Sequence, residues 1–264
     1  MGKTIGVLSL KGGVGKTSSV VALGSALANL GKKVLLVDAN FSAPNLGLHL
    51  NVVDPEVTLH SVLENKAHPK EAVQRVLNFD IMPACIFGNP NLNYLKLRDK
   101  IKSLKRSYDI ILLDSSPALN EETLAAMNAS DEILVVTTPD HSTLSTTLKS
   151  VKLAKQKGIP IIGLILNKVY EKGFELSIDD VEDTIEVPVM AVIPYDINIL
   201  KALAEFVPSP VYKPSSKSSE EYNKLAATLV GEKYKSKGFR NLFRKIKPKR
   251  HEINRIVYYE QVFK

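Results

Sequence analysis

The sequence predicts an α/β domain built on a mostly parallel, twisted sheet with helices on both faces. Two observations predict it. Short β-branched runs alternate with helical patterns through most of the chain, and the interiors of most of these runs are continuously apolar. Continuous apolar runs are typical of strands that are buried on both faces, as in parallel sheets covered by helices. With 264 residues, of which 44% are hydrophobic, the chain is long enough for one large domain of this kind.

The predicted elements follow one another in the order that such a sheet requires. Buried strands are predicted at residues 4–9, 33–38, 80–83, 109–114, 132–137, 161–167 and 187–194. Helices are predicted at residues 16–30, 95–107, 121–129 and 142–157. Gly31 ends the first of these helices, whose apolar residues recur at helical spacing. A last helix is expected to begin at Ser218, with Glu221 completing a capping box, after a proline- and serine-rich connector at residues 207–217.

The composition excludes several classes of protein. A single cysteine, Cys85, leaves no disulfide framework and no cysteine metal cluster within the chain, and the five histidines show no zinc-ligand spacing. No stretch approaches the ~18 apolar residues of a membrane-spanning helix. The apolar segment at the N-terminus is about six residues long, shorter than a signal-peptide core. We therefore expect a reduced, cytoplasmic protein.

The net charge of +7 is unevenly distributed. Residues 233–264 hold eleven Lys or Arg and two Glu, a net charge of +9, whereas the rest of the chain carries −2. This predicts a near-neutral domain at residues 1–232 and a basic tail at residues 233–264. A basic tail indicates an anionic partner surface, either a membrane or a nucleic acid.

A glycine-rich loop joins the first strand to the first helix. This strand–loop–helix context is the one that a phosphate-binding loop needs, because glycines bring backbone amides against phosphate oxygens at a helix N-terminus. Lys16 can pair with the β- and γ-phosphates, and Thr17 offers a hydroxyl to Mg²⁺. Leu10 stands where the strict motif requires glycine. The predicted nucleotide-binding residues of the loop are Gly12, Gly13, Val14, Gly15, Lys16, Thr17 and Ser18.

With Lys11 at its start, this loop resembles the deviant Walker A motif of the MinD/ParA family of ATPases, in which the residue before the extra lysine is variable. The resemblance covers roughly residues 3–232 and includes further segments at 37–40, 44–48, 109–117, 136–140, 166–168 and 193–196. It implies a single-domain P-loop NTPase fold, ATP and Mg²⁺ as cofactors, and a homodimer that forms on ATP.

The resemblance also implies roles for side chains at other strand ends. Asp114 would contact Mg²⁺ through water, and Asp38 would lie near Mg²⁺ and the attacking water. Lys11 would reach across the dimer interface to the partner's nucleotide. Asn167 would hydrogen-bond the adenine. The backbone of Pro194, Tyr195 and Asp196 would complete the base pocket.

Asn40 bears on catalysis, and Tyr170 bears on whether the nucleotide carries adenine or guanine. Asn40 stands where family members usually carry a second aspartate that helps to position or activate the water. An amide can hold a water but cannot take its proton, so slow hydrolysis is expected. Tyr170 occupies the place of the guanine-reading aspartate in GTP enzymes of related fold, and this favours ATP.

The basic tail contains an amphipathic segment near residues 238–247. Arg and Lys flank its apolar face, and Pro248 ends the pattern. The segment resembles the membrane-targeting sequence of the MinD-like branch of the family, although nucleic-acid binding and docking on the body remain alternatives. The resemblance gives no precedent for residues 249–264, which could extend the anchor, add a strand or bind a partner. The apolar face of the segment consists of Phe239, Leu242, Phe243 and Ile246.

The functional hypothesis is a MinD-like ATPase switch. It dimerises with MgATP, binds the inner face of the cell membrane through its tail and is released on hydrolysis. It thereby positions the division machinery or another cargo, with an unidentified protein activator. The alternatives are a ParA-like ATPase that partitions DNA or cargo, and a slow-hydrolysing, nucleotide-locked membrane scaffold.

Overall fold

The computed structural model describes residues 2–88, 92–234 and 248–264, and the predicted amphipathic segment near 238–247 lies outside these residues. Its sheet has the strand order β3-β4-β2-β5-β1-β6-β7-β8. Every neighbouring pair is parallel except β3 and β4. The predicted fold class is therefore confirmed. The strands are β1 (Lys3–Leu8), β2 (Val34–Ala39), β3 (Gln74–Val76), β4 (Phe79–Met82), β5 (Ile110–Ser115), β6 (Glu132–Thr137), β7 (Ile161–Val169) and β8 (Val189–Pro194).

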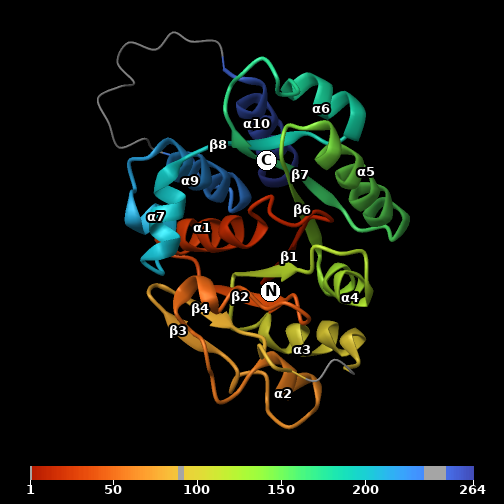
Figure 1. Cartoon of the computed structure of the whole chain (residues 1–264), viewed down its shortest axis with the longest axis vertical. Coiled ribbons are helices and arrows are strands. Elements are labelled where there is room, and N and C mark those ends of the chain that lie inside the picture. Colours follow the sequence, from red (N-terminus) through yellow and green to blue (C-terminus); the bar gives the residue numbers. More distant parts are fainter. Residues whose placement is uncertain (1, 89–91, 235–247) are drawn as a thin grey trace.

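Helices cover both faces of the sheet (Figure 1). One face carries α1 (Lys16–Asn29), α7 (Ile197–Ala204), α8 (Ser209–Tyr212) and α9 (Lys217–Leu229). The other carries α2 (Leu59–Leu63), α3 (Leu97–Leu104), α4 (Glu121–Ala129), α5 (His141–Gln156) and α6 (Ile178–Ile185). Two short 3₁₀ helices span Leu48–Leu50 and Tyr94–Lys96. Separate apolar clusters on the two faces bury the strands, as their continuous apolar sequences predict.

The start of α9 differs from the prediction. Ser216, and not Ser218, is the N-cap: its hydroxyl accepts a hydrogen bond from the Ser219 backbone at 3.2 Å. Ser218 instead donates to Asp196 Oδ2 at 2.6 Å. The expected capping box between Ser218 and Glu221 is therefore wrong, and Glu221 is free for other partners.

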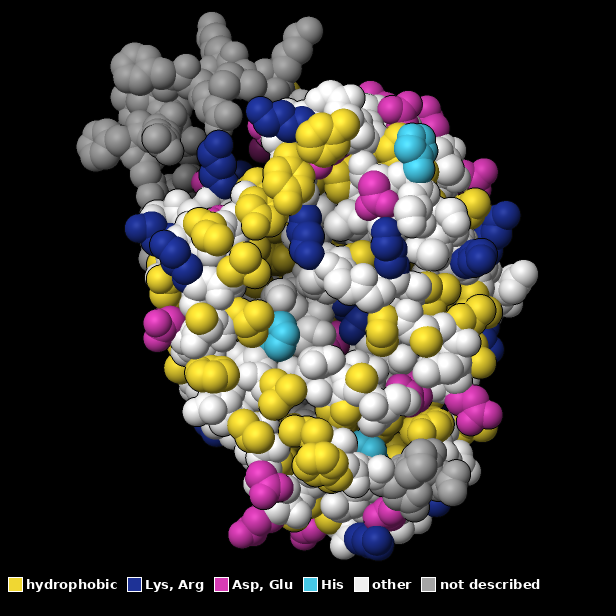
Figure 2. All heavy atoms as spheres, in the orientation of Figure 1, with side chains coloured by type: hydrophobic (Ala, Val, Ile, Leu, Met, Phe, Trp, Pro, Cys, Tyr) yellow, Lys and Arg dark blue, Asp and Glu magenta, His cyan; other side chains and the backbone are white. Residues whose placement is uncertain are grey.

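Residues 249–264 form an additional element, the helix α10 (Arg250–Phe263), which lies against β8 and α9 at one end of the sheet (Figure 1). Of the three alternatives for this segment, an added strand is therefore excluded. No helix in the described part of the chain is long and apolar enough to cross a membrane. Figure 2 shows charged side chains of both signs spread over one face of the molecule, with hydrophobic side chains gathered in a band near the top.

Candidate functional site

The phosphate loop lies at the carboxyl end of the central strand β1, which pairs with β5 on one side and β6 on the other. The connections of a doubly wound sheet diverge at such a strand, and the crevice beside its carboxyl end is the usual ligand site. The strand register places Asp38 of β2 directly opposite Asp114 of β5, and Asp114 opposite Val7 of β1. The sheet therefore brings both predicted metal-site aspartates to the loop.

Two glycines of the loop have backbone conformations that other residues rarely adopt. Gly13 has φ +78°, and Gly15, the N-cap of α1, has φ +90°. A Cβ atom on Gly15 would also collide with the amide of Asn167. Glycine is required at position 15 both for its conformation and for the close approach of β7. The loop thus ends at a helix N-terminus whose first backbone amides lack partners within the helix.

Lys16 and Thr17 are both bound to Asp114. The Lys16 ammonium donates to Asp114 Oδ1, and the Thr17 hydroxyl donates to Asp114 Oδ2 at 2.6 Å. Lys16 and Asp114 are both buried. The structure thus joins the predicted phosphate lysine directly to the predicted magnesium aspartate.

Asp38 adds a second buried carboxylate to this site. It accepts hydrogen bonds from the backbone amides of Asn40, Asn45 and Leu46 at 3.2, 3.0 and 2.9 Å. Burial and the neighbouring charge of Asp114 nevertheless raise the pKa of Asp38 to about 7. Two buried carboxylates beside one ammonium leave an excess of negative charge that a divalent cation would neutralise.

The donor set fits Mg²⁺. Mg²⁺ in nucleotide sites is held by one or two carboxylates together with substrate phosphates, rather than by a cage of protein ligands. The chain offers Asp38, Asp114 and the Thr17 hydroxyl. The described residues contain no group of three or more His, Cys, Asp or Glu side chains that could hold a metal alone, which agrees with a site completed by phosphate.

Asn40 is buried beside this pair and has one unused acceptor. Its Nδ2 donates to the Ala43 carbonyl, whereas its buried Oδ1 has no hydrogen-bond partner. A buried carbonyl oxygen without a partner is costly. The Oδ1 atom of Asn40 is therefore an unused hydrogen-bond acceptor beside the two aspartates.

Lys11 contacts the start of α5 within its own subunit. Its Nζ atom donates to Thr143 Oγ1 at 2.7 Å and to Asp140 Oδ1 and Ser142 Oγ at 3.3 Å. Asp140 is also the N-cap of α5. Although burial opposes it, hydrogen bonds from Thr138, Thr143 and Lys11 hold the pKa of Asp140 below its usual range. Sequence analysis did not identify these partners, although Asp140 follows β6, the neighbour of β1, and precedes a helical pattern.

Strands β7 and β8 bring the predicted base-binding residues to the same edge. Asn167 Nδ2 donates to the Val14 carbonyl at 2.7 Å. Lys168, which sequence analysis did not select, donates to the Gly13 carbonyl at 2.6 Å. Both side chains therefore hold the phosphate loop against the end of β7.

The residues that follow β8 are held by their own contacts. The Tyr195 ring stacks on Tyr170 with centroids 4.8 Å apart, and the Tyr195 amide donates to the Val169 carbonyl at 2.8 Å. Asp196 caps α7 and accepts the Ser218 hydroxyl. Pro194 is the last residue of β8. The three predicted residues thus lie at the end of β8, with Tyr195 stacked on Tyr170.

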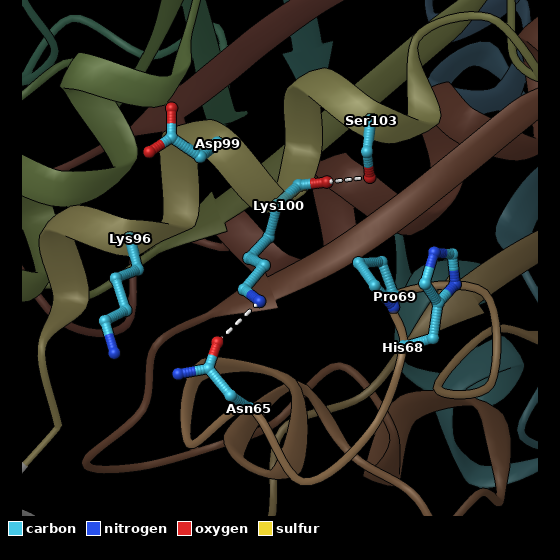
Figure 3. A pocket seen from close by; sticks show the side chains of 7 residues that line it. All are labelled: Asn65, His68, Pro69, Lys96, Asp99, Lys100 and Ser103. Carbon is cyan, nitrogen blue, oxygen red and sulfur yellow. Dashed lines mark hydrogen bonds between the residues drawn. The ribbon is translucent and has the colours of Figure 1, made fainter.

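A separate depression lies between α3 and the loop that follows α2 (Figure 3). Lys100 reaches across it from α3 and donates to Asn65 Oδ1 at 2.8 Å, while Asp99 turns away. None of the predicted site residues lines it. The catalytic and nucleotide-binding candidates therefore belong to the sheet edge alone.

Comparison with known proteins agrees with this geometry. A family model described as an AAA domain matches residues 2–161. An uncharacterized ATP-binding protein of Methanocaldococcus jannaschii is 34% identical over 246 residues, covering 89% of this chain and 90% of the relative. The structure of the cell division ATPase MinD of Pyrococcus furiosus matches with a TM-score of 0.81 and 37% identity, covering 86% of this chain and 97% of that one. The septum site-determining protein MinD of Pyrococcus horikoshii, solved with Mg-ADP, matches with a TM-score of 0.81 and 34% identity, covering 93% of this chain and 100% of that one.

Proposed function

Because this chain belongs to the MinD/ParA family of P-loop ATPases, we propose that it is a MinD-like switch in which ATP controls dimerisation and thereby attachment to a membrane. The chain is an ATP hydrolase that uses ATP and Mg²⁺. The observation that carries the proposal is the position of the phosphate loop. Lys11 and Lys16 belong to this loop, which lies at the same sheet edge as the Asp38–Asp114 pair.

In this proposal, Lys16 leaves Asp114 when nucleotide binds and pairs with the β- and γ-phosphates. The backbone amides of residues 12–18 hold the phosphate oxygens. Thr17, Asp38 and Asp114 would hold Mg²⁺, and the ion would supply positive charge to offset that of the phosphates. Asn167 and the turn at residues 194–196 bind the adenine.

Asn40 governs the attacking water. Its free Oδ1 accepts a hydrogen bond and fixes the position of that water, but an amide cannot take up the proton. Phosphoryl transfer depends mostly on positioning and charge stabilisation, so hydrolysis proceeds, but slowly. A slow step gives the ATP-bound state a long lifetime, as a switch requires.

Lys11 is the proposed link between nucleotide and dimer. In the structure it is bound to Thr143 and Asp140 of its own subunit through a half-exposed ion pair. Such a pair is weak in water, typically below about 1 kcal/mol. The phosphates of the partner's nucleotide can therefore draw Lys11 away from α5. At that nucleotide, Lys11 would stabilise the charge on the transferred phosphate.

The proposed membrane contact lies in the tail at residues 233–264, whereas residues 1–232 carry the nucleotide site. The segment at 238–247 combines an apolar face with a net positive charge. Each Lys or Arg near an anionic leaflet adds about 1 kcal/mol. A single short segment binds reversibly, and two on one dimer raise avidity ~100-fold or more. The chain is thus proposed to be peripheral on the inner face of the cell membrane.

Co-sedimentation with anionic vesicles tests the proposal. The full-length chain is expected to sediment with MgATP and to remain in the supernatant with MgADP or without nucleotide. Phe243→Glu should abolish sedimentation and leave ATP binding intact, whereas the matched control Phe243→Leu should sediment like the wild type. Nucleotide-independent sedimentation of the wild type would contradict the switch.

The charge of the tail also supports a second candidate, a ParA-like ATPase that partitions DNA. The Lys and Arg residues of 233–264, apart from the buried Arg255, could neutralise nucleic-acid phosphates. Retention on DNA that falls steeply with salt, without vesicle binding, would favour this candidate. The apolar residues of the segment favour lipid, because phosphate neutralisation alone does not use them.

A further inference from the structure

The strand β7 is irregular where it reaches the phosphate loop. Its pairing with β8 advances by three residues on β7, from Leu166 to Val169, but by only two residues on β8. Such a β-bulge bends a strand and redirects its side chains. The residues inside the bulge are Asn167 and Lys168. Lys168 has φ +57°, in the left-handed region that residues other than glycine rarely adopt.

The bulge lets two successive side chains reach the same loop. In a regular strand, successive side chains point to opposite faces of the sheet. Here Asn167 Nδ2 donates to the Val14 carbonyl at 2.7 Å, and Lys168 Nζ donates to the Gly13 carbonyl at 2.6 Å. An unfavourable backbone conformation persists only where surrounding contacts hold it. The irregular end of β7 is therefore tied to two neighbouring peptides of the phosphate loop.

These two hydrogen bonds fix the direction of two backbone amides. In a planar trans peptide, the carbonyl and the amide point in opposite directions. Lys168 holds the Gly13 carbonyl toward β7, so the amide of Val14 points away from that strand. Asn167 does the same for the peptide that joins Val14 to Gly15. Within the described residues, neither amide has an acceptor. Successive unpaired amides at a helix N-terminus form a concave anion site.

We propose that Lys168 is a positioning residue for the binding of phosphates, a role that rests on the proposed function of the loop. Its ammonium group orients the loop before nucleotide arrives, so that the amides already point toward the phosphates. Lys168 acts through the loop, because its ammonium is bound to the Gly13 carbonyl. Donors that are oriented in advance bind an anion without the cost of ordering the loop. Loss of the ammonium should therefore weaken every ligand that carries the phosphates, with or without a base.

The exposure of Lys168 separates this role from a structural one. Its side chain is exposed, and substitution of an exposed side chain usually changes the free energy of unfolding little. Asn167, in contrast, is buried, and its amide lies where a Cβ atom on Gly15 would be. Variants of Lys168 should therefore change phosphate affinity while their Tm stays close to that of the wild type.

The first test compares ligands with and without a base by isothermal titration calorimetry. Lys168→Met removes the ammonium group and keeps the apolar stem. It should raise the dissociation constants of MgATP and of magnesium tripolyphosphate by the same factor, about fivefold. Lys168→Arg, which keeps a charged donor, should restore most of the affinity for both ligands. Lys172→Met removes another exposed lysine that follows β7 and should bind both ligands like the wild type.

A second test reports on the loop without any ligand. In the nucleotide-free protein, ¹⁵N relaxation should give a lower order parameter for the Val14 amide in Lys168→Met than in the wild type. The Gly15 amide, whose peptide is held by Asn167, should change less. If Lys168 only attracted the phosphates directly, the Val14 order parameter would be the same in both proteins, and this result would overturn the inference.

The outcomes also separate the two proposals. If Lys168→Met binds MgATP and tripolyphosphate like the wild type while Lys16→Ala binds neither, the role of Lys168 is wrong and the proposed phosphate site stands. A loss confined to MgATP would assign Lys168 to the base and would also overturn the inference. If tripolyphosphate binding by the wild type does not depend on Lys16, the proposed phosphate site is wrong, and the role of Lys168 falls with it.

Discussion

A hydrogen bond of 2.7 Å joins Nζ of Lys11 to Oγ1 of Thr143, and an ion pair of 3.3 Å joins the same lysine to Asp140. Both partners lie at the start of α5 in the same subunit. If Lys11 must reach a second subunit, these contacts compete with dimerisation. The first prediction follows from this competition.

Asp140→Asn should make ATP-dependent dimerisation easier. Asparagine caps a helix as well as aspartate does, so α5 keeps its N-cap while Lys11 loses its ion pair. The dissociation constant of the dimer, measured by sedimentation velocity in MgATP, should fall roughly two- to fivefold. Lys11→Ala should weaken it, and the double variant should behave like Lys11→Ala. A dimer no tighter than that of the wild type would show that the contact within the subunit does not compete.

Lys16→Ala should abolish MgATP binding, because the phosphates lose their direct cation. It also leaves the buried Asp114 without its ammonium partner, and breaking such a pair costs about 3–5 kcal/mol. Lys16→Gln serves as the matched variant, because it keeps a donor near Asp114. Thermal unfolding with and without MgATP should show a ligand-induced increase in Tm for the wild type alone. If MgATP raised the Tm of either variant as much as that of the wild type, the assignment of Lys16 to the phosphate site would be wrong.

Asn40→Asp should raise the rate of ATP hydrolysis, because a carboxylate can both hold the water and take up its proton. General-base catalysis contributes about 10²–10⁴-fold, so an increase of at least ~10-fold is expected in single-turnover measurements. Asn40→Ala removes the free Oδ1 and should be slower than the wild type. An Asn40→Asp rate at or below that of the wild type would mean that other groups position the water.

The docking of α10 should weaken in acid. Although burial opposes it, His251, Arg255 and Lys224 hold the pKa of Glu221 well below its usual range. A carboxylate with a depressed folded-state pKa stabilises the fold above its ordinary pKa of 4.5, and this stabilisation is lost as the pH falls from that value toward the folded-state pKa.

Hydrogen exchange measures this loss. Protection of the α10 amides should be unchanged between pH 8 and about pH 5, after correction for intrinsic exchange, and should fall below it. In Glu221→Gln the protection should be lower at pH 8 than in the wild type, and it should change less with pH because only Glu182, which binds Arg250 and Asn254 of α10, remains to lose its charge. Wild-type protection that persists at pH 3 would show that Glu221 does not hold α10.

The parts of the site that depend on local sequence could be predicted. The loop at residues 11–17, Asp38 and Asp114 were found because each follows an apolar strand, and parallel strands end at one sheet edge. The partners of Lys11 were not found, since they depend on β6 lying beside β1, a pairing that no single segment encodes.

Three of the features that the sequence did not predict have separate physical causes. The helix α10 docks through Arg255 and Asn254, whereas sequence patterns identify docked helices by their apolar side. The strand β3 has only three residues, too few for a periodic signal. The N-cap of α9 is Ser216, and not the predicted Ser218, whose hydroxyl binds Asp196. This contact joins distant parts of the chain, so the local sequence does not predict it.

The contacts of α10 with β8 have a consequence for solubility. An open sheet edge is a template for strand addition between molecules, which leads to aggregation. At one end of this sheet, Asn254 and Arg255 of α10 bind two successive carbonyls of the edge strand β8, those of Val189 and Met190. At the other end, β3 is short and carries the exposed Arg75. α10 therefore covers part of the longer edge strand, and loss of α10 would leave more of β8 open to pairing with another copy of the chain.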